Sequence, residues 1–304
     1  MLNLPDTPRH VRTRPIQGTG RMMLLLGPAV LGVALLFGGG VLMALLQGLG
    51  YLPGAGMAEL SWIHFQRIFA DPDFSRSLGL TFYIAGVSTL VAGCGGVATA
   101  LALNSLAARS RWLHFVFQIP LTVPHLVIAV AVLFMLSPAG LFSRAAQTLG
   151  LIHGPGQFPL LVNDPYGIGI MVTYVWKEIP FITLMVFAVL GNTGRELLEV
   201  GRTLKAGPWQ RFRYITLPTI FPSLAAASLI VFAYTFGAFE VPYLLGRTHP
   251  LLLPVQAYKQ YSDVDLMARP EGIATGLIIA LVVVGCILLA QALTWTARSR
   301  GVSP

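Results

Sequence analysis

Six long apolar stretches, nearly free of charge, constrain the fold of this chain more than any other feature of its sequence. A helix needs about 20 apolar residues to cross the hydrocarbon core of a bilayer, and each stretch is long enough. We expect an all-α integral membrane protein with six transmembrane helices. They should occupy residues 22–47, 78–106, 115–136, 167–190, 219–246 and 273–295.

The composition supports a membrane protein. Of 304 residues, 55% are hydrophobic and 11% are charged, whereas a soluble protein has roughly 25% charged residues. So few charges cannot cover a soluble domain of this size, and apolar side chains must face lipid. The net charge of +8 does not indicate nucleic-acid binding, because the basic residues lie in short segments between the apolar stretches. We expect a multi-pass protein of a bacterial inner (plasma) membrane.

The distribution of Lys and Arg predicts that both termini are cytoplasmic. The N-terminal tail, the 107–114 turn, the 191–218 loop and the C-terminal tail hold thirteen Lys and Arg residues, whereas the three opposite loops hold six. In membrane proteins the cytoplasmic loops carry the excess of basic residues. The first apolar stretch is longer than the apolar region of a signal peptide, so we expect it to be retained.

The fourth span is unusual because Lys177 and Glu178 lie near its middle, followed by Pro180. Leaving this span out would reduce the count to five and place Arg298 and Arg300 on the outer side, against the positive-inside rule. The six-span interpretation is therefore retained.

The predicted cytoplasmic loop 191–218 reads GNTGRELLEVGRTLKAGPWQRFRYITLP. Residues 196–204 contain no proline and are expected to form one short helix. Gly207-Pro208 should interrupt it, because glycine permits unusual dihedrals and proline cannot continue the hydrogen-bond ladder. A second short helix is expected over 209–215, with Leu217-Pro218 ending it and starting the next span. Two short helices would form a knob outside the membrane.

This loop resembles the EAA loop of binding-protein-dependent ABC transporter permeases, the MetI-like family. The family pattern runs Glu-Ala-Ala, three residues, Gly, nine residues, Ile, one residue and Leu-Pro. Glu199, Ile215 and Leu217-Pro218 match it in register, whereas Val200 and Gly201 replace the alanines and Lys205 replaces the glycine. The resemblance assigns a coupling role to Glu196, Glu199, Gly201, Leu204, Lys205, Gly207, Ile215, Leu217 and Pro218. A basic loop bound to anionic lipid is the simpler alternative.

Other segments resemble the spermidine/putrescine-type branch of this family. They are Trp176–Phe181, Phe236–Pro242 and Ile119-Pro120 through Pro124-His125, so that the similarity spans roughly 78–297. The implied organisation is a cytoplasmic tail 1–21, a first helix 22–47, an extracytoplasmic loop 48–77, a permease core 78–297 with the loop 191–218, and a cytoplasmic tail 298–304.

The resemblance also implies partners. The loop would dock in a dimer of separate ATP-binding cassette ATPases, and this chain would pair with a second permease subunit, expected to be a paralogue. An extracytoplasmic binding protein would deliver the cargo. The chain has no G-x-x-x-x-G-K-[ST] phosphate loop, so no cofactor is expected here, and ATP and Mg²⁺ would bind to the ATPase. No metal site is expected either.

Ionisable residues inside a membrane need a partner or a water-filled path. For Lys177 and Glu178 two interpretations are open, a tie to a neighbouring helix or a place on the translocation pathway. The same two apply to Glu240, expected near the outer end of the fifth span, and Phe236 is a further pathway candidate. The lone His125 is expected to have a hydrogen-bonded structural role.

Three function classes compete. An importer subunit needs no chemistry in this chain. An intramembrane enzyme would need a catalytic constellation, and we identify no catalytic residue. A secondary transporter would favour internal repeats and broken helices, and would leave the loop motif unexplained. For an importer the resemblance favours a polyamine or related amine as cargo, with iron, thiamine, phosphonate or another small solute as alternatives.

Overall fold

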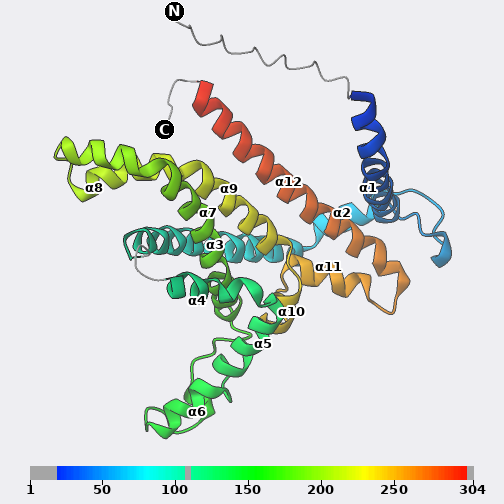
Figure 1. Cartoon of the computed structure of the whole chain (residues 1–304). Coiled ribbons are helices and arrows are strands. Elements are labelled where there is room, and N and C mark those ends of the chain that lie inside the picture. The colour runs from blue at the N-terminus through cyan, green and yellow to red at the C-terminus, as the bar shows by residue number, and fades with distance from the viewer. Residues whose placement is uncertain (1–18, 107–110, 300–304) are drawn as a thin grey trace, which may run out of the picture.

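The computed structural model describes residues 19–106 and 111–299, and within them the secondary structure is helical apart from one isolated bridge between Leu52 and Met57 (Figure 1). The α-helices are α1 (Thr19–Gly48), α2 (Ile63–Ala70), α3 (Pro72–Leu106), α4 (Arg111–Thr122), α5 (His125–Leu136), α6 (Leu141–Thr148), α7 (Ile168–Thr203), α8 (Pro208–Arg211), α9 (Leu217–Gly237), α10 (Glu240–Leu245), α11 (Leu253–Tyr261) and α12 (Arg269–Ser299). A π-helical segment, Phe212–Thr216, joins α8 to α9.

Six apolar segments of this structure are long enough to cross a membrane, which confirms the predicted all-α fold with six spans. They are Leu25–Gly48, Pro72–Asn104, His125–Thr148, Ile168–Gly191, Pro208–Gly237 and Leu266–Ala292. The fourth span, which contains two charged residues, is among them. Helix α7 runs through Lys177, Glu178 and Pro180 without interruption.

The centre of the fold is the pair α3 and α7, which make the most extensive contact between helices. Two adjacent glycines of α3 permit this approach. A Cβ atom on Gly95 would lie 2.8 Å from Ile179, and one on Gly96 would lie 2.8 Å from the Cβ of Ile182. The Thr183 hydroxyl of α7 donates a hydrogen bond to the Gly96 carbonyl at 3.1 Å. Small residues and interhelical hydrogen bonds hold helices together where lipid removes the hydrophobic drive.

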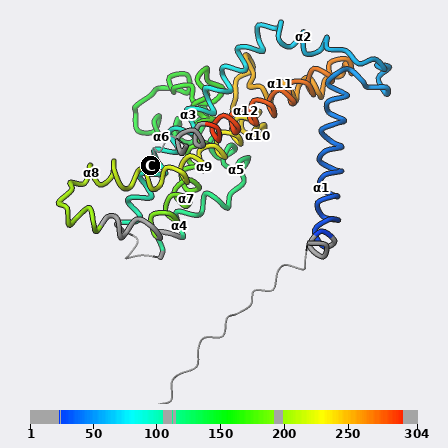
Figure 2. The backbone as a smooth tube through the Cα atoms, turned by 90° about the horizontal axis from the view of Figure 1, so that it is seen from above, coloured from blue at the N-terminus to red at the C-terminus, as the bar shows by residue number. Residues whose placement is uncertain are grey.

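The first helix stands apart from this centre. Figures 1 and 2 both show α1 away from the bundle, approaching it only where α1 ends beside α12. A Cβ on Gly48 would meet Leu277 at 3.2 Å and the backbone of Ala274 at 3.6 Å, so the helices are close at that point. Elsewhere the described apolar side chains of α1 are largely exposed, as expected for a helix that faces lipid.

The third predicted span, 115–136, is wrong as a single helix. The structure ends α4 at Thr122 and begins α5 at His125. The cause is Pro124, which has no N–H to donate and disfavours the helical conformation for Val123 before it. The apolar stretch continues instead from α5 through a turn into α6.

The fifth predicted span, 219–246, is also interrupted. Helix α9 ends at Gly237, Ala238 is extended, and the short helix α10 follows. In an unbroken helix the ring of Pro242 would clash with the carbonyl four residues earlier, which belongs to Ala238. The sequence predicted Glu240 inside the fifth span, and this is wrong. Glu240 is the first residue of α10 and is exposed.

Candidate coupling loop and membrane-embedded polar site

The predicted knob of two separate short helices is wrong. Its first part is the end of α7, which continues to Thr203, and its second part joins α9 through the π-helical segment. The connection between these two long arms is only 204–207. The reason is local: no proline interrupts 191–203, and Leu217-Pro218 follows directly on the π-helical segment, where the Leu217 N–H bonds to the Phe212 carbonyl five residues earlier and the helical path continues.

Lys205 closes the end of α7 in a left-handed conformation, with φ of 56°. Its N–H donates to the Arg202 carbonyl and the Ala206 N–H donates to the Gly201 carbonyl, both at 3.0 Å. These two bonds form a Schellman motif, in which glycine is the usual left-handed residue. Lys205 stands where the EAA pattern has its glycine. The left-handed conformation of this residue explains why the pattern has glycine there. This chain forms the same turn with a lysine.

The two arms pack against each other at the motif positions. Gly201 is buried, and a Cβ on it would lie 2.8 Å from the Ile215 side chain and 3.4 Å from that of Arg211. The EAA pattern has its second alanine at the position of Gly201. Because Gly201 has no side-chain methyl, the opposite arm can lie closer to α7 here. Leu217 and Pro218 are half-buried at the base of the same arm.

The tip of the loop presents an exposed surface, which we call the turn surface: Glu199, Val200, Leu204, Trp209 and Tyr214. Leu204, Trp209 and Tyr214 are 76%, 71% and 75% exposed. Gly207 donates its N–H to the Gln210 side chain at 2.9 Å, which fixes the start of α8. The side chain of Glu196 lies outside the described residues. Large exposed apolar side chains that gather in one patch mark a contact with a protein or with the membrane.

A second group of residues lies within the membrane spans. Lys177 and Glu178 leave α7 in different directions, yet both reach the break between α4 and α5. The Lys177 ammonium donates to the Val123 carbonyl, and the Glu178 carboxylate bonds to the His125 ring at 3.1 Å. Both charges are therefore ties to the third span, and Glu178 is buried.

His125 links three spans. Its second ring nitrogen, Nδ1, bonds to the Tyr234 hydroxyl of α9 at 3.0 Å, and its ring packs on Tyr234 with 4.5 Å between centroids. The hydrogen-bonded role expected for His125 is confirmed. The Tyr174 ring of α7 lies next to both, fully buried. We call His125, Tyr174, Lys177, Glu178 and Tyr234 the polar cluster.

Tyr174 was missed by the sequence analysis, although it precedes Glu178 by four residues and so lies on the same face of α7. Its hydroxyl has no hydrogen-bond partner within the described part of the chain. Glu178 and Glu240 both lie within electrostatic range of the Tyr174 and Tyr234 hydroxyls. The structure thus places Glu240 in the surroundings of the polar cluster.

Phe236 lies elsewhere. It is fully buried and packs against Phe82 at 4.8 Å and Phe232 at 5.7 Å between ring centroids. This aromatic group belongs to the apolar packing around α3, α9 and α12.

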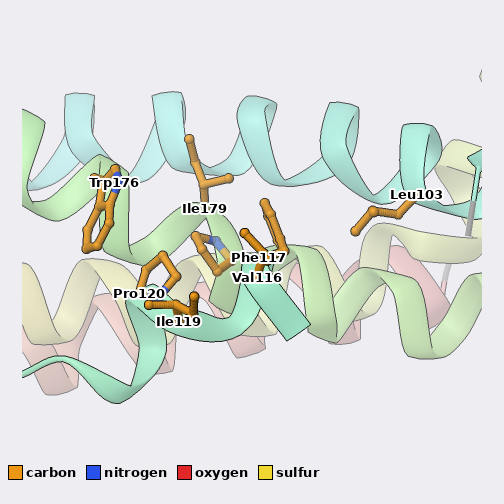
Figure 3. A pocket seen from close by; sticks show the side chains of 8 residues that line it. Leu103, Val116, Phe117, Ile119, Pro120, Trp176 and Ile179 are labelled. Carbon is orange, nitrogen blue, oxygen red and sulfur yellow. The ribbon is translucent and has the colours of Figure 1, made fainter. Parts of the chain in front are cut away.

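An apolar pocket of about 560 Å³ adjoins the broken third span. Figure 3 shows Ile119 and Pro120 of α4 on one side and Trp176 and Ile179 of α7 on the other. Its lining is completed by Leu103, Val116, Phe117 and Pro180. No charged residue lines it, so it is no cargo site for an ion. Among the residues that the structure describes, no group of three His, Cys, Asp or Glu side chains is placed to hold a metal ion.

Comparison with known proteins gives one family. The model of the family described as "Binding-protein-dependent transport system inner membrane component" matches residues 92–296, about two thirds of the chain.

Individual relatives of this chain are also described as permease proteins. The chain is 28% identical to the inner membrane ABC transporter permease protein YnjC of Escherichia coli over 80% of this chain, but spans only 45% of that protein. It is 27% identical to the molybdenum transport system permease protein ModB of Azotobacter vinelandii, over 67% of this chain and 87% of the relative. Its fold resembles a bacterial ABC transporter involved in alginate import, with a TM-score of 0.76, 20% identity and coverage of 92% and 97% of the two chains.

Proposed function

The chain belongs to the family of binding-protein-dependent transport system inner membrane components, and from that membership we propose that it forms part of the membrane path of an ATP-driven importer. It is a multi-pass inner membrane protein and a transport component rather than an enzyme. Family membership carries the proposal and also accounts for the loop motif, which a secondary transporter would leave unexplained.

The turn surface is the proposed docking site for a separate ATPase. Leu204 lies on the short connection between two long helices and Trp209 lies in α8 directly after it; both are exposed. A push on this tip would be transmitted along α7 and α9. We further propose that ATP and Mg²⁺ bind to that ATPase. The complex would include an extracytoplasmic binding protein and a second permease subunit, a paralogue of this chain.

Co-purification with the ATPase and cargo-dependent ATP hydrolysis by the complex test this role. Leu204→Asp should abolish both, because a charge would replace an apolar contact. Leu149→Asp is the matched control, since Leu149 is 74% exposed but lies in the loop predicted to be on the opposite side of the membrane. Co-purification that survives Leu204→Asp and Trp209→Asp together would contradict the proposed docking site.

For the cargo we propose a polyamine or related small amine. The polar cluster and its surroundings hold two carboxylates, Glu178 and Glu240, while the one cation, Lys177, is engaged with a backbone carbonyl. Carboxylates and aromatic faces attract an ammonium group. They repel an anion, which argues against the cargo types named for ModB and the alginate transporter.

Uptake assays separate these possibilities. The reconstituted complex should import a radiolabelled polyamine and not molybdate or an alginate oligosaccharide. A Glu178→Gln/Glu240→Gln double variant should lose that uptake, whereas Glu59→Gln, a change at an exposed carboxylate of the outer loop, should not. Wild-type uptake by a correctly assembled double variant would rule out the amine pathway. A binding assay on the cognate binding protein gives an independent measure of cargo.

A further inference from the structure

The break in the third span is held by two ties to one helix. Val127 donates its N–H to the Pro124 carbonyl, so the Val123 carbonyl is left without the helical partner it would have in an unbroken span. The Lys177 ammonium of α7 takes that place. Two residues further on, His125 bonds to Glu178, also of α7.

None of the described side chains of α4 is fully buried. The apolar pocket between α4, α7 and α3 leaves about 560 Å³ beside Pro120 and Trp176 (Figure 3). A segment that packs poorly along its length and is tied at one end is free to move once the tie is released. The contacts at Val123 and His125 therefore control the position of α4.

The direction of the hydrogen bond between His125 and Glu178 follows from the protonation states of the two groups. An ionised carboxylate only accepts hydrogen bonds, so Nε2 of His125 donates to Glu178. In a neutral imidazole Nδ1 then accepts, and the Tyr234 hydroxyl donates to it. Both ring nitrogens have a partner, and the histidine bridges α7 and α9.

The Tyr174 hydroxyl is the unpaired member of the polar cluster. It is fully buried and has no partner within the described residues, although its surroundings include Glu178, Glu240 and Tyr234. A buried hydroxyl without a partner is unfavourable. A ligand that donates hydrogen bonds would satisfy it, and an ammonium group is such a ligand.

We propose that the His125–Glu178 hydrogen bond is a latch across the broken third span, and that an ammonium group of the cargo opens it. The ammonium takes the place of His125 on the Glu178 carboxylate and donates a second hydrogen bond to Tyr174. The exchange is favourable because an ion pair between the ammonium and the carboxylate replaces a hydrogen bond from a neutral imidazole to the same carboxylate. Release of His125 leaves the break held by Lys177 alone, so that α4 moves more easily. This inference rests on the proposed amine cargo.

ATP hydrolysis by the reconstituted complex, measured with and without a polyamine, tests the latch. His125→Phe keeps a ring but removes both hydrogen bonds, so hydrolysis without cargo should rise about five- to tenfold and its stimulation by the amine should shrink accordingly. His125→Gln can donate to Glu178 and accept from Tyr234, and it should restore low hydrolysis and stimulation. His153→Phe, a change at an exposed loop histidine, is the control and should match wild type.

The binding role of Tyr174 has its own measurement. Tyr174→Phe should raise the amine concentration for half-maximal uptake about fivefold, because only the hydroxyl is lost. If amine uptake is normal but His125→Phe, in amounts of assembled complex equal to wild type, leaves cargo stimulation unchanged, the latch is wrong and the proposed function stands. If the wild-type complex imports no amine, both the amine cargo and the latch are wrong.

Discussion

At the scale of single residues, Lys205 shows how a motif position records a backbone requirement. The EAA pattern has glycine there, and the structure gives this lysine a φ of 56° in the Schellman turn that ends α7. A side chain in this conformation costs about 1–2 kcal/mol because its Cβ crowds the following carbonyl. The replacement of glycine by Lys205 therefore lowers the stability of the turn but does not change its shape.

Lys205→Gly should stabilise the turn by about 1 kcal/mol, since relief of strain outweighs the added freedom of the unfolded chain. Hydrogen exchange at the Ala206 amide, which bonds to Gly201, should slow several-fold in the purified protein. Lys205→Ala keeps the Cβ and is the matched control. Equal exchange in the glycine and alanine variants would show that the left-handed conformation is not strained.

At the scale of elements, the prolines of this chain have two different effects. Pro180 lies within α7 and leaves it continuous, whereas Pro124 and Pro242 accompany breaks. The local preferences of proline are the same at each site. At Pro124 the Lys177 ammonium accounts for the outcome, because it satisfies the freed carbonyl of Val123.

The contact between α3 and α7 gives an element-scale prediction. Gly96→Ala should destabilise the protein by about 1–3 kcal/mol, because its Cβ would lie 2.8 Å from the branched Cβ of Ile182, which cannot rotate away. Gly93→Ala, where the nearest atom is 3.6 Å away on Ser228, should be close to neutral. Thermal unfolding followed by tryptophan fluorescence compares them, and equal midpoints would contradict the close approach.

At the scale of the whole molecule, the six spans place the start of α1 and the end of α12 towards the same side as α8. Helix α6 lies at the opposite end of the molecule (Figure 1). The excess of Lys and Arg in the segments next to those ends predicts that this side is cytoplasmic. The turn surface would then face the compartment that holds ATP.

Thiol labelling tests this orientation. In a background without Cys94 and Cys286, the two cysteines of the sequence, Leu204→Cys should react with an impermeant maleimide only in inverted vesicles. Leu149→Cys should react only in intact spheroplasts. Both positions are more than 70% exposed, so accessibility within the protein is matched. The reverse pattern would invert the orientation and exclude an ATPase at the turn surface.

The sequence by itself determined the number of spans and the position of the loop. Apolar length is a direct signal, because lipid requires about 20 uninterrupted residues per helix. The break before His125 was not predicted from the sequence, because the third span was expected to be one helix despite its prolines. The motif from Glu199 to Pro218 also identified the family, yet the two arms proved to be the ends of long helices.

Only the tertiary structure decided which polar residues meet. His125, Tyr174, Glu178 and Tyr234 come from three spans, and no spacing along the chain connects His125 or Tyr234 to the two residues of α7. The physical reason is that a helix in lipid is apolar on all sides, so its sequence does not mark the face that turns inward. Only the packing of α5, α7 and α9 brings these side chains together and leaves the Tyr174 hydroxyl without a hydrogen-bond partner among the described residues.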